Sequence, residues 1–267
     1  MIGPLDRMPA LALAILLSAA TAAPAQRDWH SPRPLSINPQ SAEGSVLYAM
    51  HCAACHGESG DGRGPVAHMF DPRPTDFTTG TFKLRSTPSG SLPTDDDLVR
   101  TMSAGIHGTA MRGWSTTLGP AEMAEVLRAV KSFSPRFLSG TPQPPVWIPS
   151  PPDRTLALEI HGRDVYGSGN CATCHGDVGR GDGPSSAGLA DDRGHRAHPF
   201  DFTVTHRVKA GDLPQDIYRS LVTGLDGTPM HDTARMSDAD RWALVYYLMS
   251  ISEQPASDLG PGRVVGH

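Results

Sequence analysis

The stretch Cys52-Ala53-Ala54-Cys55-His56 is repeated 119 positions later as Cys171-Ala172-Thr173-Cys174-His175. Two thiols at this spacing can each bond to one vinyl group of a porphyrin, and the His that follows is placed to give its iron an imidazole nitrogen. Cys-x-x-Cys-His is the attachment pattern of c-type haem. The two copies therefore predict two covalently bound haem c groups in a duplicated chain.

A methionine stands at the same distance from each motif. Met111 lies 59 positions after Cys52, and Met230 lies 59 positions after Cys171. Each ends a loop of nearly the same sequence, Gly108-Thr109-Ala110-Met111 in one copy and Gly227-Thr228-Pro229-Met230 in the other. Because a thioether is an established axial ligand of haem iron, these methionines are predicted iron ligands, and the adjacent His107 and His231 are the imidazole alternatives.

Other roles for four cysteines are weighed against this interpretation. Two disulfides would leave the His after each pair unexplained. An all-cysteine zinc site would require the two distant pairs to converge and would leave both His idle. A thioredoxin-like redox pair has no reason to repeat with a matched downstream Met. These alternatives remain, and haem attachment is favoured over all three.

The composition fits two small haem domains. Each copy spans about 100 residues, a size at which apolar surface alone gives a modest core. Aromatic residues make up 6% of the chain, which contains 28 Gly and 25 Pro, so loops are expected to dominate. A haem supplies the missing apolar surface, and each domain is predicted to be unstable without it. The formal charge of −5 argues against nucleic acid as a partner.

The chain divides into six predicted segments. Residues 1–25, with Arg7, an apolar run over 9–20 and an Ala-x-Ala site at 23–25, are typical of a signal peptide. Cleavage would leave no integral membrane segment, the alternative being an uncleaved anchor. Export predicts a bacterial periplasmic location, where c-type haem is attached. The remaining segments are an extended lead-in (26–40), a first haem domain (41–135), a Pro-rich linker (136–154), a second haem domain (155–253) and a flexible tail (254–267).

A glycine-rich loop follows each motif and ends at Pro65 or Pro184. The carbonyls of these prolines are predicted to accept the Nδ1 proton of His56 and His175. Both copies then reach an Asp-Phe-Thr sequence, but copy two takes six residues more to do so. Its surplus stretch contains Asp191, Asp192, His195 and His198. A solvated loop is predicted there, with a copper or zinc site as the alternative.

Helical patterns surround these loops. Gly44 and Tyr48 recur as Gly162 and Tyr166, a small and an aromatic residue on one helix face, where a second helix can approach. The acidic cluster at 95–97 is interpreted as helix N-terminal charge, or else as a docking surface. The last helical pattern has two apolar stripes. We expect its second face, with Leu244 and Leu248, to pack on the first domain or on a partner.

On these motifs the sequence resembles the class I cytochrome c family, as a tandem diheme member. The resemblance implies an all-α fold in which the first and last helices of each domain cross. It implies proximal ligands at His56 and His175 and distal ligands at Met111 and Met230. Trp114 after the first Met is similar to the family's distal loop, whereas copy two has Thr233 instead.

A His/Met pair fills both axial positions of an iron, which suits electron transfer and argues against chemistry at the metal. The leading hypothesis is a soluble periplasmic diheme electron carrier, or an electron-transfer subunit of a larger oxidoreductase, working with redox proteins as donor and acceptor. An enzyme is the second hypothesis: a peroxidase-like or thiosulfate-oxidising diheme protein with one haem open to substrate. A non-haem zinc-binding module is the third.

Overall fold

The computed structural model describes residues 42–253, which belong to one compact unit containing both Cys-x-x-Cys-His motifs. The predicted signal peptide, lead-in and tail lie outside the described residues. Within residues 42–253 the regular structure is helical, and extended segments meet only in isolated β-bridges. In the same range no helix has the length and apolar character needed to cross a membrane. The all-α prediction is confirmed.

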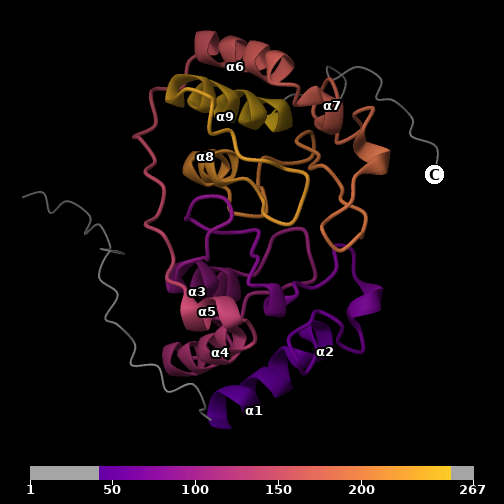
Figure 1. Ribbon diagram of the computed structural model, residues 1–267. Helices are drawn as coiled ribbons and strands as arrows, with labels where there is room; N and C mark the ends of the chain where they lie inside the picture. Colours follow the sequence, from indigo (N-terminus) through magenta and orange to yellow (C-terminus); the bar gives the residue numbers. More distant parts are fainter. Residues whose placement is uncertain (1–41, 254–267) are drawn as a thin grey trace, which may run out of the picture. The chain divides into compact units, whose positions relative to one another are not determined.

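The first copy folds around one buried cluster. Its helices are α1 (Ala42–His51), α2 (Ala53–His56), α3 (Asp95–Ala104), α4 (Pro120–Ser132) and α5 (Pro135–Ser139), with 3-10 turns η1 (Ala67–Met69) and η2 (Phe77–Thr79) (Figure 1). Helix α4 packs against α1 and α3, so the chain returns to the helix that leads into the motif. Tyr48, Val126 and Leu127 are buried between these helices. The core therefore sits directly behind the first motif.

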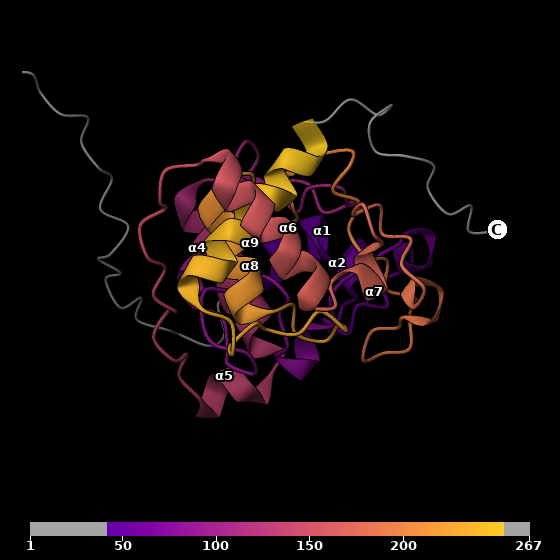
Figure 2. The same cartoon turned by 90° about the horizontal axis from the view of Figure 1, so that it is seen from above.

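The second copy repeats this arrangement. Its helices are α6 (Leu156–Ser168), α7 (Ala172–His175), α8 (Pro214–Thr223) and α9 (Asp238–Glu253), with the 3-10 turn η3 (Ser186–Gly188). Figure 2 shows α6 running across α9. A Cβ atom at Gly162 would lie 2.0 Å from the carbonyl oxygen of Ala243, so only glycine allows this crossing. The predicted close approach of a second helix is found here.

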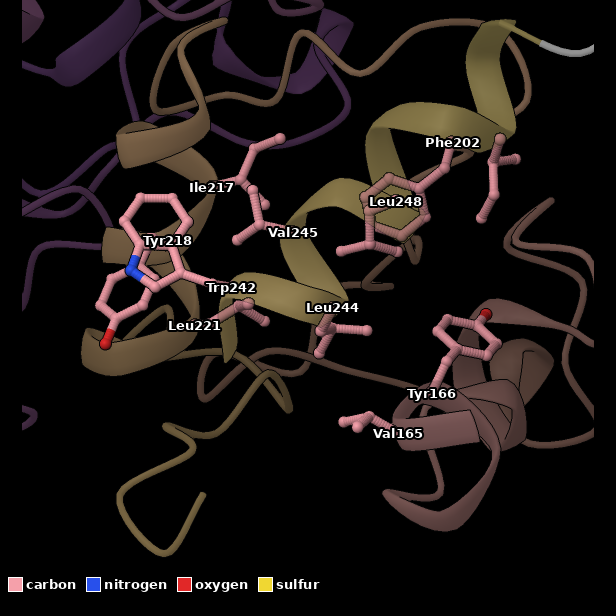
Figure 3. Packing of buried hydrophobic residues seen from close by; sticks show 11 residues of the cluster. Val165, Tyr166, Phe202, Ile217, Tyr218, Leu221, Trp242, Leu244, Val245 and Leu248 are labelled. Atoms are coloured by element: carbon pink, nitrogen blue, oxygen red, sulfur yellow. The ribbon is translucent and has the colours of Figure 1, made fainter. Parts of the chain in front are cut away.

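The two apolar stripes of α9 are both covered within the second copy. Leu244 and Leu248 are buried in a cluster to which α6, α8 and the loop carrying Phe202 contribute (Figure 3). Helix α9 lies between α6 and α8 (Figure 1), which explains why one stripe is not enough. The prediction that its second face packs on the first domain or on a partner is therefore wrong.

Helix α3 starts with a capping box. Thr94 and Asp97 form a reciprocal capping box at the start of α3, and the Asp97 carboxylate also accepts hydrogen bonds from Ser86. Asp95 pairs with Lys131 of α4 at 2.6 Å. Two of the three acidic residues at 95–97 are thus used inside the fold, as expected for N-terminal charge on a helix.

The linker is anchored to both copies. Its first residues belong to α5, and residues 140–154 have no regular structure. The Val146 amide donates to the Ser86 carbonyl at 2.7 Å in the first copy, while Ile148 packs against the core of the second. The Tyr246 hydroxyl donates to the Pro152 carbonyl at 2.7 Å. These contacts fix the linker along its length.

Candidate haem sites

Each motif forms a short helix that places its cysteines and histidine on neighbouring turns. In the first copy the His56 amide donates to the Cys52 carbonyl at 2.9 Å, and in the second His175 donates to Cys171 at the same distance. All four cysteine side chains are half-buried. Burial raises the pKa of Cys52 to about 11, with the neighbouring Cys55 adding to the shift. The Cys171 pKa is also raised by burial.

The two motif histidines use the same atom in the same way. His56 Nδ1 donates to the Thr75 carbonyl at 3.0 Å, and His175 Nδ1 donates to the Phe200 carbonyl at 3.2 Å. Burial lowers the pKa of both rings, which favours the neutral imidazole that metals bind. Within residues 42–253 no hydrogen bond occupies Nε2 of either ring. A backbone bond at Nδ1 leaves Nε2 available for iron.

The prediction that the Pro65 and Pro184 carbonyls accept the Nδ1 protons of His56 and His175 is wrong. After the glycine loop the chain runs back along the motif helix, where Val66 donates to the Ala54 carbonyl at 3.2 Å and Ser185 donates to the Thr173 carbonyl at 2.9 Å. The prolines therefore lie beside the middle of the motif, away from the histidine. The next extended segment supplies the acceptor instead.

A sequence signal for these acceptors existed and was missed. Thr75 and Phe200 each stand directly before the repeated Asp-Phe-Thr sequence. Its Asp side chain caps the turn, as Asp76 does when it accepts from the Thr78 amide at 2.9 Å. Its Phe amide donates to a glycine-loop carbonyl at 2.7 Å in both copies. The Asp-Phe-Thr repeat thus fixes the carbonyl that holds each histidine.

The aromatic ring of the same repeat supports the imidazole. Phe77 stacks on His56 with 4.4 Å between ring centroids and 15° between planes. In the second copy Phe202 lies 5.2 Å from His175 at a tilt of 41°. The histidine of the first copy is therefore held by a flatter stack.

One buried tyrosine contacts the residue that follows each motif. The Tyr48 hydroxyl donates to the Gly57 carbonyl at 2.8 Å, and the Tyr166 hydroxyl donates to the Gly176 carbonyl at 2.6 Å. Burial raises the pKa of both phenols, so they stay protonated and able to donate. The sequence had placed these residues on a helix face, but their hydroxyl bonds to the residue after each His were not predicted.

The methionine loops have the same conformation in both copies. The Ile106 amide donates to the Met111 carbonyl at 2.8 Å, and the Leu225 amide donates to the Met230 carbonyl at 2.9 Å. A threonine hydroxyl two residues earlier accepts from each Met amide, at 3.1 and 3.2 Å. Both methionine side chains are half-buried, whereas the competing His107 and His231 are exposed. The loops therefore present Met rather than His toward the protein.

The structure brings each methionine loop to the neighbourhood of its motif. In the second copy Met230 and Cys171 pack against the same buried cluster. In the first copy Trp114, three residues after Met111, lies 5.2 Å between ring centroids from His51, the residue before Cys52.

In the second copy Thr233 stands in place of Trp114, so the backbone hydrogen bond is kept but the indole ring is absent. Thr233 donates to the Leu221 carbonyl at 2.8 Å, as Trp114 donates to Met102 at 2.9 Å. Arg241 then bonds both the Thr233 hydroxyl at 3.0 Å and its carbonyl at 2.6 Å. The two distal loops thus have the same course but different side-chain support.

The surplus loop of the second copy does not form a metal site. Within residues 42–253 no group of three or more His, Cys, Asp or Glu is placed to hold a metal ion. Asp191 instead accepts backbone hydrogen bonds from Arg193 and His195. His198 pairs with Asp71 of the first copy at 3.0 Å. The prediction of a simple solvated loop is incomplete, because this loop contacts the other copy.

A small basic cavity lies next to both methionine loops. Its volume is about 50 Å³, and its lining includes Lys83, Arg85, Arg100, Lys209 and Arg219. The three arginines are paired with Asp226, Asp97 and Asp216, whereas within residues 42–253 neither lysine has an ion pair. Burial together with Lys83 lowers the pKa of Lys209. The fit of the protein to haem c therefore rests on the two Cys and one His that each motif supplies.

Comparison with known proteins agrees with the assignment of two haem c sites. The family model for cytochrome c matches residues 41–132 and 160–252. The FixP subunit of the cbb3-type cytochrome c oxidase of Azorhizobium caulinodans is 30% identical over 142 residues, covering 52% of this chain and 40% of that protein, so the chain spans less than half of this relative.

A solved structure covers more of the chain. One chain of the reducing HAO-like protein complex Kustc0457/Kustc0458 of Kuenenia stuttgartiensis is 41% identical, with a TM-score of 0.77 over 81% of this chain and 99% of that chain. Each of the two ranges that match the cytochrome c model contains one Cys-x-x-Cys-His motif. In each motif the histidine Nδ1 donates a hydrogen bond to a backbone carbonyl. The chain belongs to the cytochrome c family, as an electron-transfer protein with two cytochrome c domains that bind two haem c groups covalently.

Proposed function

We propose that the chain is a periplasmic electron-transfer protein in which His56 and Met111 hold one iron and His175 and Met230 hold the other. The observation that carries this proposal is the identical backbone pattern of the two methionine loops. A loop conserved in shape between two copies, each ending in Met, is expected of a repeated ligand. When bound, each haem iron takes up and releases one electron.

The surroundings of the histidines support electron transfer over catalysis. Each ring is held by a backbone carbonyl, and each lies against a phenylalanine of the Asp-Phe-Thr repeat. Ligands that are held in this way reorganise little when the metal changes charge. A thioether opposite the histidine also favours the ferrous state. A peroxidase-like enzyme would need one iron without this second ligand.

We propose further that the chain acts as a subunit, passing electrons between redox proteins. The 41% identical structural relative is a chain of a protein complex, and the curated relative is an oxidase subunit. A freely diffusing carrier is the other form of the same function. The predicted signal peptide at 1–25 supports export. The proposed limits of the two haem domains are 41–135 and 155–253, and the linker at 136–154 joins them.

Methionine variants test the ligands. In the holoprotein, Met111→Ala and Met230→Ala should each open one iron, so that the reduced protein binds carbon monoxide at one haem and the ferric spectrum loses its thioether band. Met69→Ala is the control, because that side chain is 69% exposed. Variant spectra that match the parent would refute sulfur ligation. Carbon monoxide binding by the parent would favour the enzyme.

The subunit role has its own test. The native mass of the holoprotein isolated without detergent from its own cells should exceed that of one chain, with a second redox protein in the particle. Recovery as a monomer that still accepts electrons would support the free carrier instead.

A further inference from the structure

The surplus loop of the second copy reaches the backbone that surrounds the first motif. Arg193 donates from Nη1 to the Pro74 carbonyl at 3.0 Å and from Nη2 to the Asp61 carbonyl at 3.3 Å. Its guanidinium passes close to Gly62, where a Cβ atom would lie 2.8 Å from Nη1. Arg193 therefore joins the two copies through a loop that the first copy does not possess.

The loop holds Arg193 in place. The Asp191 carboxylate accepts from the Arg193 amide at 3.0 Å and from the His195 amide at 2.9 Å, which closes a tight turn. The Asp192 amide donates to the Gly227 carbonyl at 3.1 Å, in the loop that ends at Met230. Arg193 is thus fixed between the methionine loop of its own copy and the proximal side of the other.

Both acceptors of Arg193 adjoin atoms that hold His56. Pro74 precedes Thr75, whose carbonyl accepts from His56 Nδ1. Asp61 precedes Gly62, whose amide donates to the His56 carbonyl at 2.8 Å. A planar guanidinium bonding two carbonyls fixes their separation, which a single-point cation does not do. Arg193 therefore clamps the two segments between which the His56 ring is oriented.

The first copy supplies no matching clamp to the second. The Phe200 carbonyl, which accepts from His175, follows Pro199. Pro199 and Arg180 are the counterparts of Pro74 and Asp61, but the first copy lacks the surplus loop that carries Arg193. The two proximal histidines are therefore supported differently, although their own hydrogen bonds match.

We propose that Arg193 is a positioning residue for His56, so that the reduction potential of the first haem depends on the docked loop of the second copy. This inference rests on the proposed ligation of iron by His56. A firm Nδ1 hydrogen bond makes an imidazole a stronger electron donor and stabilises ferric iron. Loosening the clamp should weaken this bond and favour ferrous iron at the first haem only.

Arg193→Lys tests this in the holoprotein, because it keeps the charge and removes the fork. We expect the ferrous-to-ferric ratio of the first haem to rise about tenfold at a fixed potential, an increase of about 59 mV for one electron, and that of the second to change less than about twofold. A Met230→His background assigns the two titrations, since losing the thioether lowers the second potential. Solvent exchange of the His56 Nδ1 proton, followed by NMR, should become faster by a similar factor.

His198→Ala is the matched control, because it removes a different contact of the same loop, the one to Asp71. It should leave both readouts unchanged. An equal effect of His198→Ala would assign the shift to loop docking in general and overturn the role of Arg193, as would unchanged values in Arg193→Lys or equal shifts at both haems. If Arg193→Lys does not accumulate with two haems, Arg193→Gln replaces it and the proton-exchange result decides.

The proposed function fails in a distinguishable way. Absence of covalent haem in a pyridine haemochrome assay, or parent spectra in the methionine variants, would refute the ligation itself. Two haems with His/Met spectra and unchanged Arg193→Lys values would refute only the clamp.

Discussion

Asp226→Asn should weaken the contact between the two copies. Asp226 lies in the methionine loop of the second copy and accepts three hydrogen bonds from the first: Arg85 Nη2 at 2.7 Å, Ser89 Oγ at 2.9 Å and the Gly90 amide at 2.8 Å. The Arg85 side chain is 0% exposed and that of Asp226 is 13% exposed. Asparagine keeps the shape of the side chain but replaces one accepting oxygen with a donor.

The expected loss follows from these contacts. Burial lowers the pKa of Arg85, an effect that Asp226 opposes, and a guanidinium stays charged regardless. Arg85 keeps its bond to the Thr223 carbonyl at 2.6 Å, so the buried cation is not left without any partner. Breaking a buried ion pair outright costs about 3–5 kcal/mol, and a hydrogen bond to a charged group contributes about 1.5–3 kcal/mol. We therefore expect the free energy of unfolding to fall by about 3 kcal/mol.

Denaturant unfolding of the holoprotein, followed by far-ultraviolet circular dichroism, measures this change. Ser89→Ala is the control, because it removes one neutral, exposed donor to the same carboxylate and should cost about 0.5–1 kcal/mol. An Asp226→Asn protein within about 0.5 kcal/mol of the parent would refute the reasoning. It would mean that the carboxylate's loss of hydration cancels its bonds across the contact.

Three further results are expected. Gly162→Ala should lower the free energy of unfolding by about 3 kcal/mol or more, because its Cβ meets the Ala243 carbonyl. Gly167→Ala on the same helix, with nothing within 4 Å of its Cβ, should instead raise the free energy of unfolding by about 0.5–1 kcal/mol. Equal effects of the two substitutions in thermal melts would contradict this reasoning. Tyr166→Phe should cost about 1–2 kcal/mol by leaving the Gly176 carbonyl unpaired, measured by the same melts, and a neutral result would show that water replaces the hydroxyl. Protein made without haem should give no cooperative unfolding transition in calorimetry, whereas a sharp transition would show that the polypeptide core suffices.

Most of the haem site could be predicted from local sequence patterns. The Cys-x-x-Cys-His motifs, the methionine loops and the helix caps are each patterns of a few residues, and hydrogen bonds between near neighbours hold them. The equal spacing of 59 positions from motif to Met then assigned one loop to each motif. The acceptors of the His Nδ1 protons were missed because they lie 19 and 25 residues from their rings, where the loop path decides which carbonyl arrives. The Asp-Phe-Thr repeat marked those positions, but its capping role became visible only once the turn was seen.

Sequence by itself determined that this chain carries two haem domains of one kind, because covalent attachment needs a fixed local spacing that survives in both copies. Tertiary structure alone decided how the copies differ. Three contacts join residues far apart in the chain. They are the packing of α6 and α8 on the two apolar stripes of α9, the ion pair of Arg85 with Asp226, and the hydrogen bonds of Arg193 to the backbone around His56. Such contacts depend on how helices and loops pack, and no spacing within the sequence encodes that packing.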